Sequence, residues 1–429
     1  MGFKNYGNPE LPKFIQKKVN HFFENRVAKV WNNGDLIMGS IVPDTESILL
    51  NNNDYLRIAN DSEISHAQQK AIARNGNGQM MSAVFRNHGD LQSVFENKMG
   101  DFLNREGVLL TQSGWKSNTG LLQCIADSDT VIYLDMLVHM SMWEGAKISG
   151  AKIVPFAHNN MAHLERKIKS NGPGIICVDS VYSTDGDLCP LEELAELSHK
   201  TGCCLIVDES HSLGTHGKHG EGLVAELGIS EKVHFITASL SKAFSSRAGI
   251  IACNAAQKKY ISYNSKPAIF SSMVAPYEVA GMIKTIEVIK NADKKRERLR
   301  EVSERLCSSL RTMGFNILDL DAQIIGLRCG SDADAFFVRD FLNARGIFGS
   351  VFAAPATPKN RSILRLTVHS DLTDQDLTRI EDAMVELAEE AGDIIPNLML
   401  KKMPELSTFD KVKNKLLSNK SIENLEVGA

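Results

Sequence analysis

The sequence predicts an α/β protein with a mostly parallel seven-stranded sheet and a smaller α+β region towards its C-terminus. Between about residues 59 and 290, short continuous apolar runs alternate with helical stretches, which is typical of parallel strands covered on both faces. Beyond residue 290, fewer strands lie among longer helices. With 429 residues, 43% of them hydrophobic, the chain has enough apolar material for two domains.

The strands of the large sheet are expected at seven apolar runs bounded by polar or glycine residues. These runs are residues 107–111, 130–134, 151–155, 174–178, 203–207, 233–237 and 248–252. Residues 59–290 therefore form the predicted large domain. Because ligands collect where parallel strands end, the polar residues that follow these runs are the first candidates for a site.

Fewer helices and strands are expected in the regions on either side of the large domain. Residues 1–58 form an N-terminal arm, with helical periodicity over about 9–30 and a short strand near 47–50. The predicted small domain, 291–392, combines the end of a long helical stretch with a few strands, and residues 393–429 form a C-terminal extension that includes a helical pattern over 409–417. The helical stretch covers about 276–311, and the strands are expected at 315–318, 324–327 and 362–367.

Composition and charge exclude several classes of protein. The net charge of −4 provides no general basic field for nucleic acid. Eight cysteines occur without a Cys-x-x-Cys pair, so neither a zinc site nor a disulfide framework is indicated. The first residues lack an apolar signal core, and no apolar run approaches membrane-spanning length. We therefore expect a reduced, soluble, cytoplasmic protein without a metal, nucleic-acid or membrane partner.

The groups required by pyridoxal phosphate lie in two short stretches. Asp208 follows one apolar run, and Lys242 lies in a later stretch rich in small and hydroxyl residues, which includes Thr237, Ser239 and Ser241. An amine that forms a Schiff base, an acid for the pyridine nitrogen and hydroxyls for the phosphate are what this cofactor needs from a protein. Together they predict a pyridoxal phosphate site.

Two other interpretations of these stretches were considered. An apolar strand ending in Asp208-Glu209 is also typical of P-loop ATPases, but the chain has no Gly-x-x-x-x-Gly-Lys-Ser/Thr motif. Asp208 with His211, His216 and His219 could alternatively bind a metal ion. The glycines between these histidines instead favour an open turn with solvated imidazoles.

Three motifs resemble the α-oxoamine synthases, a family of fold-type I pyridoxal phosphate enzymes. They are Val207–Gly214, Ala238–Phe244 and Ser183–Asp187. The similarity extends from about Asn53 to Leu366, most of the chain. It implies the fold-type I transferase fold, pyridoxal phosphate as cofactor, and a homodimer whose subunits share their active sites.

The resemblance also implies roles for individual residues. Lys242 would hold the cofactor and later take the α-proton, Asp208 would pair with the pyridine nitrogen, His211 would bind the phenolic oxygen, and His139 would stack on the ring, although a core histidine is an alternative interpretation. Arg365 would bind the substrate carboxylate, or else form a structural ion pair. Further cofactor contacts are expected from Asp179, Ser183, Gly114, Trp115, Thr237 and Ser239, and from Ser271 and Ser272 towards a neighbouring subunit.

The chain departs from the family where many relatives have a glycine-rich segment. Residues 78–87 are instead bulky and apolar, and residues 245–247 interrupt the glycines that often follow the lysine. With residues 112–118, 139–145 and 348–357, these changes most resemble the subfamily that makes α-hydroxyketone quorum-sensing autoinducers. The candidates for an acyl-chain wall are Met80, Met81, Val84 and Phe85, with core packing as the alternative.

The resemblance implies a condensation of a small amino-acid substrate, 2-aminobutyrate or S-adenosylmethionine, with a medium- or long-chain acyl-coenzyme A. The product would be an α-aminoketone, the precursor of an α-hydroxyketone signal. The alternatives are an enzyme similar to 8-amino-7-oxononanoate or 5-aminolevulinate synthase, or a non-catalytic metal- or ligand-binding protein on the same fold.

Overall fold

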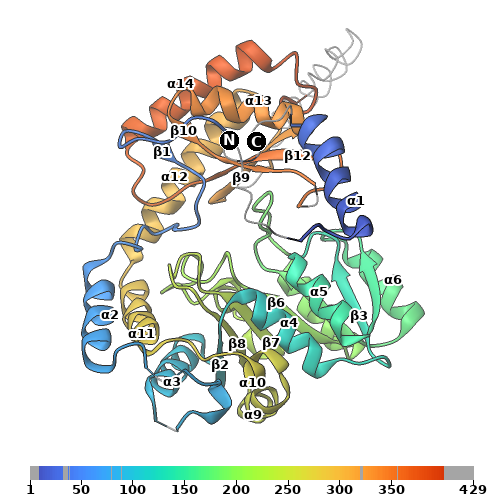
Figure 1. Cartoon of the computed structure of the whole chain (residues 1–429), viewed down its shortest axis with the longest axis vertical. Helices are drawn as coiled ribbons and strands as arrows, with labels where there is room; N and C mark the ends of the chain where they lie inside the picture. The colour runs from blue at the N-terminus through green and yellow to red at the C-terminus, as the bar shows by residue number, and fades with distance from the viewer. Residues whose placement is uncertain are drawn as a thin grey trace, which may run out of the picture.

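The computed structural model describes residues 9–31, 37, 39–78, 80–87, 89–318, 322–354 and 356–400. Figure 1 shows its two principal sheets one above the other, with the seven-stranded sheet below and the three-stranded sheet above. The predicted boundaries at residues 58, 290 and 392 stay a prediction. No helix among the described residues is long and apolar enough to cross a membrane.

The large sheet has seven strands in the order β2-β8-β7-β6-β5-β3-β4. They are β2 (Gly107–Thr111), β3 (Val131–Asp135), β4 (Lys152–Phe156), β5 (Ile175–Asp179), β6 (Cys204–Asp208), β7 (Phe235–Ser239) and β8 (Gly249–Cys253). Only β8 runs opposite to the other six strands of this sheet, which confirms the prediction of a mostly parallel sheet. All but β2 end one or two residues later than predicted, because the residues that close them still pair across the ladder, as Asp179 does with Asp208.

Helices cover both faces of this sheet, which explains the continuous apolar runs. Along β6, Leu205 and Val207 belong to one buried cluster and Ile206 to the other, because successive side chains of a strand point to opposite faces. The helices of this region are α2 (Ser62–Asn75), α3 (Leu91–Leu103), α4 (Gly114–Ile125), α5 (Met140–Ser149), α6 (Met161–Asn171), α7 (Leu191–Thr201), α8 (Leu223–Glu226), α9 (Ala255–Asn264), α10 (Lys266–Phe270) and α11 (Pro276–Lys290).

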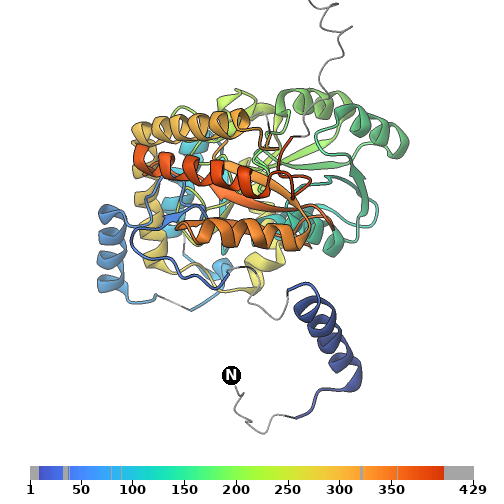
Figure 2. The same cartoon turned by 90° about the horizontal axis from the view of Figure 1, so that it is seen from above.

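The smaller sheet is antiparallel, in the order β11-β12-β9. Three helices, α12, α13 and α14, lie on its far side from the large sheet (Figures 1 and 2). A short strand from the arm, β1 (Ile48–Leu49), pairs in parallel with β10 (Ile347–Phe348). The remaining elements are β9 (Ile324–Gly330), β11 (Ser350–Phe352), β12 (Ser362–Thr367), α12 (Asp293–Thr312), α13 (Asp332–Asn343) and α14 (Asp374–Ala391).

Two predictions for this region were wrong. Residues 315–318 do not form a strand: Phe315 makes one isolated bridge with Met399, and the Asn316 amide donates to the Leu398 carbonyl. The chain near residue 398 therefore satisfies this backbone instead of a sheet. The long helix predicted over 276–311 is two helices, since α11 ends at Lys290 and α12 begins at Asp293.

The arm has the predicted helical character. The helix α1 (Lys13–Phe22) continues into a π-helical segment at Phe23–Ala28 and has no buried residue, and Figure 2 shows it standing apart from the body of the protein. Residues 1–8 and 401–429, including the helical pattern predicted at 409–417, lie outside the described residues.

Candidate active site

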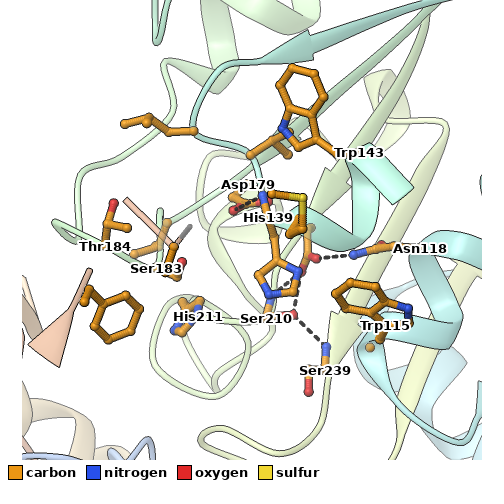
Figure 3. Close-up of a pocket in the computed structure, with 18 of the residues that line it drawn as sticks. Trp115, Asn118, His139, Trp143, Asp179, Ser183, Thr184, Ser210, His211 and Ser239 are labelled. Carbon is orange, nitrogen blue, oxygen red and sulfur yellow. Dashed lines mark hydrogen bonds between the residues drawn. The ribbon is translucent and has the colours of Figure 1, made fainter. Parts of the chain in front are cut away.

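A cavity of about 540 Å³ lies where strands of the large sheet end and face the small sheet. This volume is ordinary for a site that binds a small molecule. Ten of the residues predicted from the sequence line the cavity: Gly114, Trp115, His139, Asp179, Ser183, Asp208, His211, Ser239, Lys242 and Arg365. Several of them surround the cavity in Figure 3.

Asp208 ends β6 and is held by three hydrogen bonds. Asn118 Nδ2 donates to its Oδ2 at 2.7 Å, and the amide and hydroxyl of Ser210 donate to its Oδ1 at 2.9 and 2.5 Å. The Ser210 hydroxyl in turn accepts a hydrogen bond from the Ser239 amide at 2.7 Å, as Figure 3 shows. The carboxylate therefore has one orientation. Asn118 and Ser210 were not among the predicted site residues, because a small polar residue in a helix or turn has no distinctive pattern.

Lys242 lies in the turn that follows β7, and it lines the cavity. Burial lowers the pKa of Lys242, the charge of Arg365 lowers it further, and the carboxylate of Asp208 offsets part of this decrease. A lower pKa increases the fraction of uncharged amine at neutral pH, which is the form that acts as a nucleophile or a base.

His139 caps α5 beside the end of β5. Its backbone amide donates to Asp179 Oδ2 at 3.1 Å, and its Nδ1 lies 2.7 Å from the Ser141 hydroxyl. Its ring meets that of Trp115 edge to face at 6.1 Å (Figure 3). Burial, followed by the charge of Asp208, raises the pKa of Asp179 well above its ordinary range. A protonated Asp179 avoids placing two like charges side by side.

His211 is buried and meets a residue that the sequence analysis did not select. The Tyr55 hydroxyl lies 2.5 Å from His211 Nδ1, and Tyr55 is fully buried. Burial lowers the pKa of His211 well below its ordinary range, with further lowering by Lys242 and Arg365. His211 therefore stays neutral, and its other nitrogen is available towards the cavity.

Arg365 on β12 forms the opposite wall of the cavity. Its Nη1 donates to the Ser183 carbonyl at 2.8 Å, its Nη2 donates to Asn53 Oδ1 at 3.3 Å, and its guanidinium lies 4.4 Å from the ring centre of Phe352. Its Nε is buried and has no hydrogen-bond partner among the residues that the structure describes. Arg365 lines the cavity and has no carboxylate partner among the residues that the structure describes, so its guanidinium suits a carboxylate ligand better than a structural ion pair.

The start of α4 makes a cradle beside Ser239. The side chain of Ser113 caps the helix by accepting from the Lys116 amide, and the amides of Gly114 and Trp115 precede the first intrahelical donor, so they are free for an anion. A Cβ at Gly114 would lie 2.6 Å from that of Ser239. Glycine is therefore needed to bring this helix end against β7.

The other predicted residues do not line this cavity. Thr237 is fully buried within β7. Ser272 pairs with Ser82 in an isolated bridge, and the neighbouring Met273 amide donates to the Met81 carbonyl at 2.9 Å. The others are Ser241, Ser271 and the four candidates for the acyl-chain wall, Met80, Met81, Val84 and Phe85. Within one chain the segments around Ser82 and Ser272 lie beside each other and outside the cavity lining, and their contacts with a cofactor or substrate stay a prediction.

The arrangement does not favour the alternative metal site. His216 Nδ1 lies 3.0 Å from the Thr215 hydroxyl, and His219 approaches Asp293 at 3.9 Å, whereas His211 meets Tyr55. No group of three or more His, Cys, Asp or Glu residues in the described part of the chain is arranged to hold a metal ion.

The fold and the cavity define a class of protein that comparison with known families makes explicit. The model of the family "Aminotransferase class I and II" matches residues 45–384. The chain belongs to this family and, within it, to the α-oxoamine synthases, which are pyridoxal phosphate-dependent C-acyltransferases.

Individual members of this class resemble the chain to different degrees. The chain is 40% identical to the CAI-1 autoinducer synthase of Vibrio campbellii over 376 residues, which cover 88% of this chain and 95% of that protein. It is 27% identical to the 8-amino-7-oxononanoate synthase of Lysinibacillus sphaericus, covering 86% and 94% of the two chains. The solved structure of serine palmitoyltransferase from Sphingomonas wittichii has a TM-score of 0.81 at 25% identity and covers 90% of this chain and all of that one.

Pyridoxal phosphate is the cofactor of this class, and the residues present fit it. A buried carboxylate with three donors suits a protonated ring nitrogen, an amine of lowered pKa suits the aldehyde, and the open helix end beside Ser239 suits the phosphate.

Proposed function

We propose that this enzyme makes the α-aminoketone precursor of an α-hydroxyketone autoinducer. It would join a small amino-acid substrate, 2-aminobutyrate or S-adenosylmethionine, to a medium- or long-chain acyl-coenzyme A. The observation that carries this proposal is the cavity in which Lys242, Asp208 and Arg365 converge. The 40% identity with an autoinducer synthase favours this product over other α-oxoamines.

The bonds that change are those of an acylation followed by a decarboxylation. The amino-acid Cα forms a bond to the thioester carbonyl carbon while the carbon–sulfur bond breaks and coenzyme A leaves as its thiol. The resulting β-keto acid loses carbon dioxide, and Cα regains a proton. When bound, pyridoxal phosphate supplies an aldehyde for the amino group and a cationic ring that accepts electron density from Cα.

The large sheet and the segments that follow its strands contribute Asp208, Lys242 and His139 to the cavity, and we call this side the cavity floor. Its residues would hold and move protons. Asp208 would keep a proton at the ring nitrogen, which its fixed orientation allows. Lys242, whose pKa burial lowers, would take the α-proton. His139 would lie against the ring and help to orient the bond that breaks; partial removal from water lowers the pKa of His139 and favours its neutral form. Ordered placement of this kind can contribute several kcal/mol of barrier lowering, up to about 7–11.

The opposite wall would select the substrate. Arg365 lines the cavity and is oriented by Ser183 and Asn53, so its guanidinium would bind the carboxylate of the amino acid. The hydroxyl of Ser183 and the free nitrogen of His211 would bind the phenolic oxygen of the cofactor. The phosphate would lie between the amides of Gly114 and Trp115 and the hydroxyl of Ser239.

A homodimer with shared sites belongs to the same proposal. Phe270 is 79% exposed and Met80 is 74% exposed, and their segments are joined by the bridge between Ser82 and Ser272. A second copy would cover this apolar surface and receive Ser271 and Ser272 at its phosphate and Met81 and Phe85 at its acyl chain. Exposed apolar patches of this kind are typical of interfaces.

The second candidate product is 8-amino-7-oxononanoate, favoured by the 27% identity with a synthase of that compound. Purified enzyme loaded with pyridoxal phosphate should be offered a pool of acyl-coenzyme A thioesters with 2-aminobutyrate, S-adenosylmethionine or alanine, and its products identified by mass spectrometry. We expect medium- or long-chain aminoketones. Formation of 8-amino-7-oxononanoate alone, from pimeloyl-coenzyme A and alanine, would reject the proposed product.

A further inference from the structure

Behind the cavity, one histidine joins two aspartates from distant parts of the chain. His158 Nδ1 lies 2.8 Å from Asp135 Oδ1, and His158 Nε2 forms a short hydrogen bond with Asp187 Oδ2. Asp135 ends β3, and Asp187 lies in the loop between β5 and α7. None of these three residues lines the cavity. We call the cluster the His158 bridge.

The geometry of the His158 bridge defines its protonation state. Each ring nitrogen faces a carboxylate oxygen, but a neutral imidazole has only one N–H group to donate. The other nitrogen would then direct its lone pair at a carboxylate. When both aspartates are carboxylates, only an imidazolium can donate from both nitrogens, so the arrangement favours the charged form.

The surrounding residues support that charge. Asp135 is fully buried, and the Tyr182 ring meets His158 edge to face at 4.4 Å. Burial by itself lowers the pKa of His158, but the hydrogen bonds and charges of Asp135 and Asp187 outweigh it and raise the pKa to about 9. Two other charged neighbours, Asp185 and Arg328, lie 3.5 Å from each other.

The first aspartate of the bridge connects to the His139 side of the cavity. Asp135 Oδ1 accepts from the Leu137 amide at 2.8 Å, and its Oδ2 accepts from the Asn159 amide at 2.9 Å. Residues 136–140, which follow, line the cavity. The carboxylate of Asp135 therefore fixes the turn from which His139 extends.

The second aspartate connects to the Arg365 side. The Tyr182 amide donates to the Asp187 carbonyl, and the Gly186 amide to the Tyr182 carbonyl, both at 3.0 Å, which closes a tight loop. Ser183 in this loop lines the cavity, and its carbonyl accepts from Arg365 at 2.8 Å. The bridge thus ties together the two walls between which the substrate would lie.

The residue after His158 has a strained backbone, which indicates that the surrounding contacts fix the arrangement. Asn159 has φ of +50°, a left-handed conformation that costs energy for any residue with a side chain. Its Nδ2 donates to Asp187 Oδ2 at 3.1 Å and to the Leu188 carbonyl at 2.9 Å. The same loop is therefore bound from two adjacent positions.

We infer that His158 is a positioning residue: as an imidazolium bound to Asp135 and Asp187, it holds the His139 turn and the Ser183 loop at a fixed separation. Its effect on catalysis rests on the proposed function, whereas its charge state does not. It acts through His139, Ser183 and Arg365 and does not touch the substrate.

The first test is the charge state itself, measured without substrate. Nitrogen-15 NMR of histidine-labelled enzyme should show both ring nitrogens of His158 protonated at pH 7.5, with loss of one proton at about pH 9. The His158→Gln variant assigns the signal by its disappearance. A neutral His158 at pH 7.5 would overturn the inference whatever the enzyme makes.

The second test separates positioning from general stability. In His158→Gln, kcat/KM for the amino acid should fall about tenfold to a hundredfold because the two walls lose their relative placement, while KM for acyl-coenzyme A stays within about twofold. The control is His199→Gln on the exposed end of α7, which should match the wild type. Equal losses for both substrates, or no loss, would reject the positioning role.

A third variant covers the case in which His158→Gln fails to fold. Asp187→Asn keeps the shape of the side chain but removes one charge, so His158 should deprotonate at a lower pH than in the wild type, and the amino-acid KM should rise along the same pH profile. An unchanged profile would contradict the inference. If His158 is charged but no thioester is acylated onto any amino acid, the proposed function fails instead.

Discussion

The cavity floor and the segment around Met80 and Phe270 are opposite in character. On the floor, Asp208 is 5% exposed and has three donors. On the surface, Phe270 and Phe85 are 79% and 73% exposed. Buried polar groups with partners are complete within one chain, whereas exposed apolar groups are stabilised only when something covers them. The difference supports the proposal that a second copy covers the surface segment, as the shared sites proposed above would require.

The largest expected effect concerns the floor. Lys242→Ala removes the amine of lowered pKa and should reduce kcat by about 10²- to 10⁴-fold, the usual contribution of a positioned acid or base. Steady-state rates and the absorbance of bound cofactor would measure it. Lys218→Ala, on the exposed loop after β6, is the matched control. Wild-type turnover in Lys242→Ala would remove the basis of the proposed chemistry.

The next effect concerns the surface segment. Phe270→Asp places a charge on the apolar patch and should weaken dimerisation by about 30-fold, the equivalent of a 2 kcal/mol contact. Sedimentation at several protein concentrations would detect it, and activity should fall with the dimer because Ser271 and Ser272 would leave the partner's site. Phe337→Asp, a change at an exposed phenylalanine of α13, should leave association unchanged. If both variants associate equally well, the patch is not the interface.

The smallest expected effect tests whether the surface segment contacts the acyl chain. Met81→Ala should change the preference for acyl-chain length by about fourfold for each methylene that loses contact, since burying one contributes about 0.8 kcal/mol. Competition between thioesters of different length, read by mass spectrometry, gives this ratio directly. A wild-type profile would assign Met81 to packing instead.

Local patterns predicted the large sheet well and the small region less well. Each of the seven apolar runs became a strand, because strands buried on both faces must be apolar throughout. The run at 315–318 did not, since Phe315 and Asn316 bond to the chain near residue 398. The short strands β10 and β11 were not predicted, because two or three residues carry no periodicity.

For the site, too, the sequence predicted some features and the tertiary structure decided others. By itself, the sequence determined which residue types could do the chemistry, since Lys242 and Asp208 stand in motifs a few residues long. Only the tertiary structure decided what holds them. Asn118 reaches Asp208 across 90 positions, Tyr55 reaches His211 across 156, and Arg365 reaches Ser183 across 182. Hydrogen bonds depend on distance in space, and a single sequence records only distance along the chain.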